Sequence, residues 1–350
     1  MDALDKEIRL SFSKRIKGTL PEPYQTLISE EKEKDSPDFK YNNDDTPFAA
    51  QGREMAQLIR KKAPNDDFSP LFETIEQQAA DIGISNPQLP STDAFVTSIC
   101  WVGSKSMSHV LACIERSKER LVQLSATNPE ARKQVITSIM TYWQHQQGVG
   151  IVILDKLLNY QILAPENIIE WTLIDKVNRG TLLASAWTYE LVDKTVQKVS
   201  NRIRSIVHAI RQPLLTDEQR AELQQTLNTE LEKNKQLFNT IQDAVTSIRD
   251  GNQDEMIESS DALRAEDEDL LRTWGGKWAR VFQRKYAVEE SWVREELAKP
   301  IPEPPVVPEP VVKDETMNDV ATADRNGDLG SGENGYKLKA DNDDDDDGIE

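Results

Sequence analysis

LVDKTVQKVSNRIRSIVHAI (residues 191–210) and LNTELEKNKQLFNTIQDAVTSI (residues 227–248) are the two segments that decide the fold class. In both, apolar residues recur at alternating intervals of four and three, the spacing of a heptad seam on one helix face. Asn234 interrupts the second seam and could fix its register. The seams are short, so they predict two long helices either paired across residues 211–213 or packed as ordinary core helices. The seam positions are Val192, Val196, Val199, Ile203, Ile206 and Ile210, then Leu227, Leu231, Asn234, Phe238, Ile241, Val245 and Ile248.

Shorter helices are predicted before this pair, and the connectors between them are short, so neighbours should pack antiparallel. A capping residue followed by proline, or a cluster of Ser, Thr and Asp, marks a helix start. Gly148 and Gly150 are predicted to break the helix that begins after residue 128. The predicted starts are Thr46-Pro47, Ser69-Pro70, Ser91-Thr92-Asp93, Asn128-Pro129-Glu130 and Ala164-Pro165.

Helical stretches are also predicted near both ends. Residues 4–16 place Leu4, Ile8, Phe12 and Ile16 on one helix face. Residues 254–297 form the other stretch and contain Gly275-Gly276. Two adjacent glycines cost about 2 kcal/mol of helix propensity relative to alanines, so we expect a break or a close backbone contact there. Its aromatic residues, expected in the core before a partner site, are Trp274, Trp278, Phe282, Tyr286 and Trp292.

The last fifty residues differ in composition from the rest. Six prolines lie in PIPEPPVVPEP, residues 300–310, which is typical of an extended polyproline-like segment. Residues 301–350 carry 15 acidic and 4 basic side chains, in a chain whose net charge is −19. Such a segment cannot bury enough apolar area to offset its ordering entropy, so we predict a disordered acidic tail.

The expected fold is all-α. No segment shows sustained period-two alternation between turn residues, so no sheet is predicted. We expect an antiparallel helical-repeat, HEAT-like solenoid with a long helical hairpin. The expected divisions are an N-terminal helix and polar loop (residues 1–45), an all-helical scaffold domain (residues 46–298), and a Pro-rich then acidic disordered tail (residues 299–350).

Cysteine usage and hydropathy indicate an intracellular protein. Cys100 and Cys113 are too few for a disulfide framework and are predicted to be reduced and buried. No run of about 18 apolar residues is present, and the first twelve residues lack the apolar core of a secretory signal. We therefore expect the cytosol or nucleus and no membrane partner.

Motifs for catalysis or cofactor binding are false matches. Residues 330–335 fit the dinucleotide pattern G-x-G-x-x-G, but they lie in the acidic tail rather than between a strand and a helix. DRNGD at residues 324–328 resembles the start of a calcium loop, yet Leu329 stands where that loop needs glycine and Gly335 where it needs glutamate. We expect no enzyme activity, no catalytic residue, no metal site and no cofactor.

Histidines and basic side chains give weaker hints. The three histidines fall on separate predicted helices without metal-ligand spacing, so surface or capping roles are favoured. Two basic clusters could contact phosphates or an acidic partner, although a solvated helix flank is the favoured interpretation. These residues are His109, His145 and His208; the stripe Lys194, Lys198, Arg202, Arg204, His208 and Arg211; and the run Arg60, Lys61 and Lys62.

Four segments occur in an order and spacing that resembles one family. They are RLSFSKRIKGTLPEPYQTLI (9–28) followed by FKY (39–41), STDAFVTSICWVGSKSMSHVLACIERSKERLVQL (91–124), VITSIMTYWQHQQGVGIVILDKLLNYQIL (135–163), and a run from IIEW to WTYE (168–190). Residues 103–109 are similar to the family's Lys-Ser-Phe-Ser-His turn between two helices. Over about residues 9–250, the chain resembles the C-terminal third of the large subunit of the nuclear cap-binding complex.

The resemblance implies a fold, a partner and a location. The family's large subunit has three helical domains that resemble the middle domain of translation initiation factor four-G, and this chain would be the third, with a long helical hairpin. It implies binding to a small RRM-type subunit that holds the methylated guanosine cap, indirect contact with capped RNA, and contact with RNA-processing and export factors. Implied roles are splicing, export, 3′-end processing, early translation and mRNA decay, including nonsense-mediated decay, in a nuclear protein that could shuttle to the cytoplasm.

The sequence also departs from the family pattern. The two preceding domains and the basic nuclear localisation signal are not found in it, so half of the expected interface with the small subunit would be absent. The acidic tail indicates a fungal-type variant. The alternative function is another helical-repeat adaptor, in translation or RNA decay, that binds a helicase or an RRM partner. No partner-binding residue is predicted.

Overall fold

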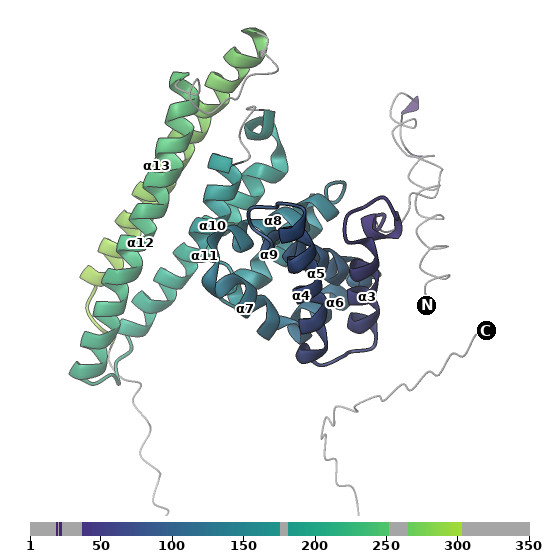
Figure 1. Cartoon of the computed structure of the whole chain (residues 1–350). Helices are drawn as coiled ribbons and strands as arrows, with labels where there is room; N and C mark the ends of the chain where they lie inside the picture. The colour runs from purple at the N-terminus through teal and green to yellow at the C-terminus, as the bar shows by residue number, and fades with distance from the viewer. Residues whose placement is uncertain (1–18, 20, 23–36, 176–180, 252–264, 303–350) are drawn as a thin grey trace, which may run out of the picture. The chain divides into compact units, whose positions relative to one another are not determined.

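The computed structural model describes residues 19, 21–22, 37–175, 181–251 and 265–302 (Figure 1). Helices follow one another with no β-strand among these residues, which confirms the predicted all-α class. The helices are α3 (Ala49–Arg60), α4 (Ser69–Asp81), α5 (Gln88–Gly103), α6 (Met107–Arg116), α7 (Lys118–Thr127), α8 (Pro129–Tyr142), α9 (Gln147–Asn159), α10 (Pro165–Ile169), α11 (Ala186–Ile210), α12 (Asp217–Asp250) and α13 (Ala265–Ala298). Short 3₁₀ turns lie at Lys40–Asn42, Asn65–Phe68 and Thr181–Ala184, and a π-helical turn at Glu170–Asp175 follows α10.

Several predictions concern segments outside the described residues. These are the helix over residues 4–16, the acidic tail and the two false motifs at residues 324–335. The division of the chain at residues 45 and 298 likewise stays a prediction. Within the described part of the chain, no helix is both long and apolar enough to cross a membrane.

Helix α5 is the centre of the first core cluster. It contacts α3, α4, α6 and α8, and most of its residues are buried. The rings of Phe68 and Phe72 meet the Phe95 ring edge-on, with centroids 5.3 and 5.4 Å away. Burying a side chain of this size stabilises the fold by roughly 1.5–3 kcal/mol. Helices before and after α5 in the sequence therefore assemble around it.

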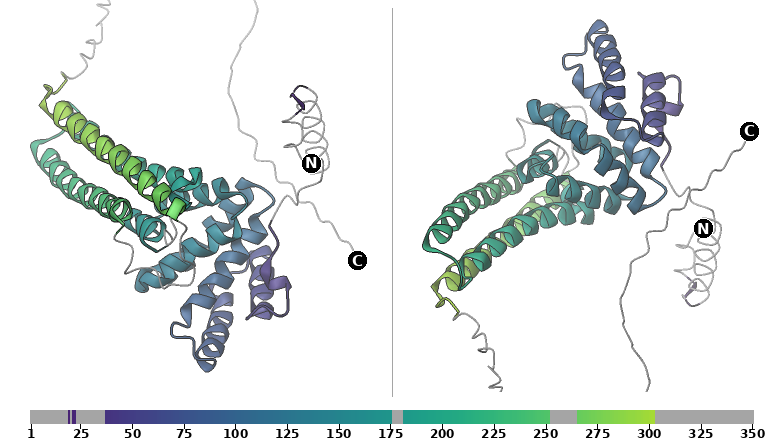
Figure 2. Two further views of the ribbon diagram at one scale, coloured as in Figure 1. Left: turned by 90° about the horizontal axis from the view of Figure 1, so that it is seen from above. Right: turned by 90° about the horizontal axis from the view of Figure 1, so that it is seen from below.

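Helices α11, α12 and α13 form the second core cluster, and α12 and α13 lie side by side in both views of Figure 2. The seam residues Val192 and Ile203 of α11, and Phe238 and Ile241 of α12, are buried in it. The prediction of two long helices joined by a turn is therefore confirmed. Pairing of these two helices alone does not describe the packing, however, because α12 packs more extensively on α13 than on α11. The seam thus belongs to a packing of three helices.

Three helix starts lie where the sequence predicts them, at residues 69, 129 and 165. Asn128 caps α8, since its side-chain oxygen accepts a hydrogen bond from the Glu130 backbone N–H at 3.0 Å. The helix start predicted at Thr46 is wrong, because the Thr46 hydroxyl donates a hydrogen bond to the Lys40 carbonyl oxygen at 2.9 Å instead of capping a helix. Helix α3 begins only at residue 49, after Phe48 in a left-handed conformation with φ 62°.

Two further boundary predictions are wrong. Helix α5 begins at Gln88, so residues 91–93 lie inside it rather than at its start. Gly148 and Gly150 lie in the first turn of α9, and the break comes before them, at residues 143–146. Close packing explains one of these glycines, because a Cβ at Gly150 would lie 2.8 Å from the sulfur of Met140 in α8.

Helix α13 runs unbroken through Gly275-Gly276. A Cβ at Gly275 would lie 2.8 Å from the Val245 carbonyl oxygen and 2.9 Å from the Arg249 backbone nitrogen. The close backbone contact with α12 is therefore confirmed, and the alternative of a break is wrong. Glycine is required here because any side chain would push the two backbones apart.

Candidate partner interface

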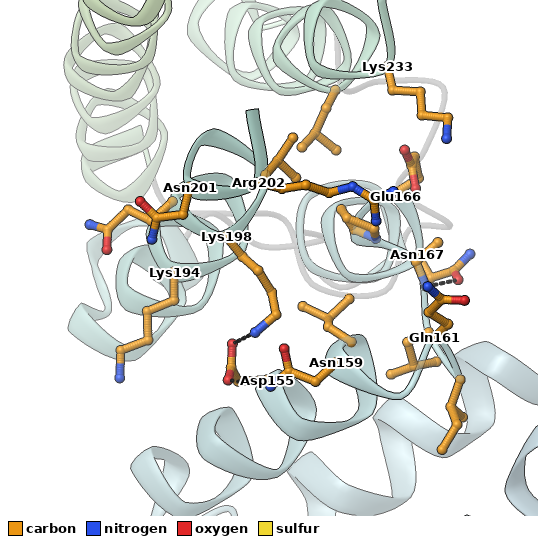
Figure 3. A pocket seen from close by; sticks show the side chains of 18 of the residues that line it. Asp155, Asn159, Gln161, Glu166, Asn167, Lys194, Lys198, Asn201, Arg202 and Lys233 are labelled. Atoms are coloured by element: carbon orange, nitrogen blue, oxygen red, sulfur yellow. Dashed lines mark hydrogen bonds and ion pairs between the residues drawn. The ribbon is translucent and has the colours of Figure 1, made fainter. Parts of the chain in front are cut away.

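A cleft of about 1340 Å³ opens between α7, α8, α9, α10, α11 and α12 (Figure 3). Val122 and Val152 contribute from α7 and α9, and Lys198 and Arg202 from α11. Helix α10 is positioned by its N-terminal turn, where the Asn167 side-chain oxygen accepts a hydrogen bond from the Ala164 backbone N–H at 2.9 Å. The cleft thus draws its walls from both core clusters.

Two valines give the cleft an apolar wall that solvent reaches. Val122 is 40% exposed and Val152 is 37% exposed, while the neighbouring lining residues Ile151 and Ile162 are buried. Single exposed apolar side chains are ordinary on protein surfaces. Here two of them border one concave surface with charged residues around it, which is the composition of a protein-binding site.

Carboxylates from three helices besides α11 itself neutralise its basic stripe. Glu230 of α12 is buried, and its carboxylate forms ion pairs with Arg202 and Lys233, each with a nitrogen–oxygen distance of 3.1 Å. Contact of the stripe with phosphates would require these pairs to break, so the stripe holds helices together rather than offering free cations. The ion pairs of the stripe are Lys194–Glu190 within α11, Lys198–Asp155 to α9, Arg202–Glu230 to α12, and Arg204–Glu289 and Arg211–Glu296 to α13.

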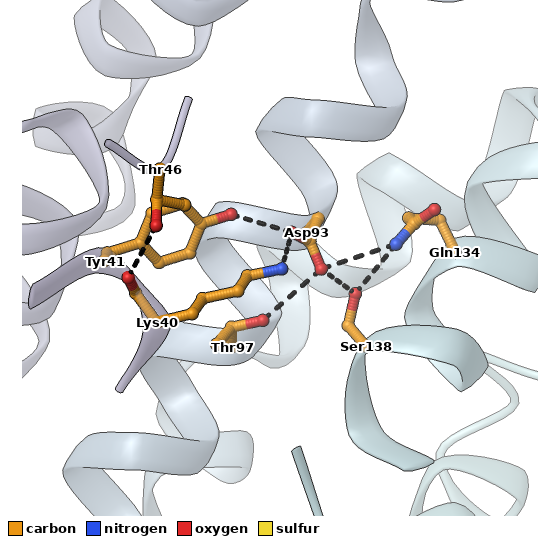
Figure 4. Close-up of polar contacts among 7 residues, drawn as sticks. All are labelled: Lys40, Tyr41, Thr46, Asp93, Thr97, Gln134 and Ser138. Carbon is orange, nitrogen blue, oxygen red and sulfur yellow. Dashed lines mark hydrogen bonds and ion pairs between the residues drawn. The ribbon is translucent and has the colours of Figure 1, made fainter. Parts of the chain in front are cut away.

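The carboxylate of Asp93 in α5 is the centre of a second polar network (Figure 4). One carboxylate oxygen accepts a hydrogen bond from the Tyr41 hydroxyl at 2.7 Å and pairs with Lys40, and the other accepts from the Ser138 hydroxyl at 2.6 Å. Burial, and then the adjacent Asp93 carboxylate, raise the pKa of the Tyr41 phenol. The network attaches the Lys40–Asn42 turn to α5 and α8, beside a second cavity of about 860 Å³. We interpret it as a structural anchor.

The chain matches a known family of proteins. A family model described as MIF4G like matches residues 39–291, which is more than half of the chain. The chain belongs to the MIF4G-like family. The match covers the first core cluster and all of the second except Val293.

The MIF4G-like chain is similar to proteins named nuclear cap-binding protein subunit 1. It is 26% identical to that of Schizosaccharomyces pombe over 206 residues, 28% identical to that of Aedes aegypti over 214 residues, and 26% identical to that of Anopheles gambiae over 213 residues. Each alignment covers 59% of this chain and 25 or 26% of the relative. The resemblance to part of the cap-binding large subunit is thereby confirmed, and the chain spans about a quarter of the length of these relatives.

Histidines of the MIF4G-like chain do not converge on a site. In the described residues, no group of three or more His, Cys, Asp or Glu side chains could hold a metal ion. His109 lies at the start of α6, where its Nδ1 is 2.7 Å from the hydroxyl of the capping residue Ser106. His208 lies on α11 with its ring edge-on to Trp292. His145 lies in the turn between α8 and α9, so its prediction as a helical residue is wrong.

Cysteines and aromatic residues of the MIF4G-like chain serve the core. Cys100 and Cys113 are free and buried, as predicted. Burial raises the pKa of the Cys100 thiol to about 12. It also raises the pKa of Cys113, while the Arg116 guanidinium acts in the opposite direction. Among the aromatic residues of α13, Trp278 and Phe282 are buried, and the remaining three are partly buried against the same cluster, as expected.

Three residues of the predicted basic stripe, Lys194, Lys198 and Arg202, line the cleft, but the sequence did not predict its apolar lining residues. Val122 follows the buried Leu121 by one position, a rotation of about 100° along an α-helix. Val152 stands in the same relation to the buried Ile151. An apolar residue beside the buried stripe of a helix could have indicated an exposed apolar residue of a binding site. A helix whose buried stripe is wide gives the same sequence pattern, so the signal is ambiguous.

Proposed function

We propose that this chain is a non-catalytic scaffold subunit of a nuclear mRNA cap-binding complex. The supporting observation is that 59% of the chain is similar to proteins named nuclear cap-binding protein subunit 1. Its role is to bind and order a small RRM-type subunit that holds the 7-methylguanosine cap. The chain then reaches capped RNA only through that subunit, and it acts in the nucleus in splicing, RNA export and mRNA decay, with shuttling to the cytoplasm.

The cleft is our proposed site for that small subunit. Protein interfaces combine an apolar centre with a polar rim, and the centre supplies most of the binding energy. Val122 and Val152 offer the apolar part, and Lys194 and Lys198 stand at the rim. Charges at a rim contribute more to orientation and association rate than to affinity. The valines are therefore the residues whose replacement should weaken the complex most.

Capture on a cap-analogue resin tests this proposal. The chain, used as bait in cell extract, is expected to be retained on 7-methylguanosine resin only when a small RRM protein is bound. Val152→Asp should reduce retention at least about tenfold, since it places a charge against the partner's apolar surface. Ile82→Asp is the matched control, because Ile82 is 67% exposed and does not line the cleft.

Two outcomes would contradict the proposal. One is failure of capture both by this chain and by a fusion that supplies the rest of the Schizosaccharomyces pombe relative. The other is retention of a helicase in place of the RRM protein, which would favour the helical adaptor of translation or RNA decay. Circular dichroism of Val152→Asp and Ile82→Asp is the folding control, and both variants are expected to keep their helical content.

A further inference from the structure

One face of α13 carries cations without carboxylates. The segment LLRTWGGKWARVFQRKYAV, residues 270–288, contains five cations and no acidic residue, in a chain with a net charge of −19. Lys277, Arg280 and Arg284 are exposed, and no carboxylate of the described residues forms an ion pair with them. They differ in this from the stripe of α11, whose cations are paired. Positive charge here is available to a partner.

Apolar side chains accompany these cations at heptad spacing. Trp274, Val281 and Val288 are seven residues apart, which is two helical turns or about 10.5 Å. Val281 is 38% exposed and Val288 is 55% exposed. Lys277 and Arg284 follow Trp274 and Val281 by three positions, so they occupy the second position of the same seam. We call these five residues the outer seam; α13 buries its other face against α11 and α12.

A groove of about 560 Å³ between α11 and α13 borders the outer seam. Val281, Val288 and Arg284 line it from α13, and so do Lys285 and Glu289, which form ion pairs with Asp193 and Arg204 of α11. The exposed amides of Gln197 and Asn201 line it from α11. The groove therefore offers apolar surface for inserted side chains, with Arg284, which has no ion-pair partner among the described residues, at its edge and hydrogen-bonding groups opposite.

We propose that the outer seam and this groove bind an acidic amphipathic helix of a partner protein. Such a helix would place its apolar side chains on Val281 and Val288, in the way that an amphipathic helix enters a groove or a heptad partner. Its carboxylates would pair with Lys277, Arg280 and Arg284. The site is separate from the cleft, so this inference does not depend on the small subunit proposed above.

Nucleic acid fits the same surface less well. Single-stranded nucleic acid binds where aromatic platforms stack on bases beside a basic groove. The exposed apolar side chains of the outer seam are valines, which offer no such platform. Its aromatic ring, Trp274, is half-buried and already has the Lys277 ammonium 4.3 Å from the ring centroid. Valines beside unpaired cations favour a partner that is both apolar and acidic.

Fluorescence anisotropy with the full chain tests the proposal. The probe is a labelled synthetic helix of about three heptads with leucine at the seam positions and glutamate on both flanks. A second peptide keeps the glutamates and replaces the leucines by glutamine. We expect the first peptide to bind, the second to bind at least about tenfold more weakly, and the affinity of the first to fall as salt rises to about 0.2 M.

Variants of the chain locate the binding. The triple change K277E, R280E and R284E should weaken the leucine peptide at least about tenfold, and so should V281S with V288S. The triple change K61E, K62E and K105E is the control, because it alters net charge equally at exposed lysines elsewhere. It should leave the affinity unchanged.

Three results would overturn the proposal. The first is that the leucine peptide does not bind, and the second is that the control variant loses as much affinity for it as the α13 variants do. The third is that an oligouridine RNA binds instead of the peptide, and that the α13 charge reversal abolishes this RNA binding. None of these assays uses cap resin or a small RRM protein. A negative result here is therefore separate from a failure of the proposed cap-binding role.

Discussion

At the scale of single residues, Asp93 joins segments that are far apart in the sequence. Replacing it by asparagine removes the negative charge that pairs with Lys40 and weakens the bonds from Tyr41 and Ser138. Hydrogen bonds to charged groups contribute more than neutral ones, so Asp93→Asn should lower the free energy of unfolding by about 1–3 kcal/mol. Urea denaturation measures it. Lys40→Ala is the control, expected to cost about 0–1 kcal/mol as an exposed ion pair; equal costs for the two variants would contradict the anchor interpretation.

The two cysteines give a second prediction at this scale. Thiolate is the reactive form of cysteine, and burial raises the pKa of Cys100 to about 12, so this thiol stays protonated at pH 8. Neither Cys100 nor Cys113 should react with a thiol reagent at pH 8 in the folded chain. Both should react in urea, as measured by absorbance of the released product. Rapid labelling of the native chain would show that one of them is accessible.

At the scale of helices, two glycines make a matched pair. Gly275→Ala should lower the free energy of unfolding by at least about 2 kcal/mol, because its Cβ would meet the backbone of α12 at 2.8 Å and neither helix can yield locally. Gly148→Ala in α9 meets nothing within 4 Å. It should instead stabilise the chain by about 0.4–1 kcal/mol through the unfolded state. Thermal unfolding of both variants checks this, and similar midpoints would refute the close-contact argument.

Helices were predictable from sequence where one local cause decides them. The seams of α11 and α12 repeat along the chain because the buried face of each helix does, and Asn128 caps α8 within its own first turn. The prediction of a helix start at Thr46 failed because the Thr46 hydroxyl donates a hydrogen bond to the Lys40 carbonyl oxygen. Local sequence does not show that this hydrogen bond forms in place of a helix cap. The cleft as a whole could not be predicted, since its walls come from six helices. Most of the carboxylates that neutralise α11 likewise lie on other helices, as Asp155 does.

At the scale of the whole molecule, net charge is a poor guide to its surfaces. The chain is strongly acidic overall, yet Lys277, Arg280 and Arg284 of α13 form no ion pair within the described part of the chain, whereas the lysines and arginines of α11 are all paired. What matters for a partner is which charges remain unpaired after folding. That distinction depends on tertiary contacts, so two basic stripes that look alike in sequence differ in the charge that they leave for a partner.

The two core clusters meet at α10, so we expect them to unfold as a single unit. Ile168 is buried in the first cluster and its neighbour Ile169 in the second. Truncating a buried isoleucine to alanine costs about 2–5 kcal/mol. Because α10 and the Lys198–Asp155 pair couple the clusters, Ile168→Ala and Ile169→Ala should each reduce hydrogen-exchange protection in α5 and α12 to the same extent. Loss of protection confined to α12 in Ile169→Ala, and to α5 in Ile168→Ala, would mean that the clusters unfold independently.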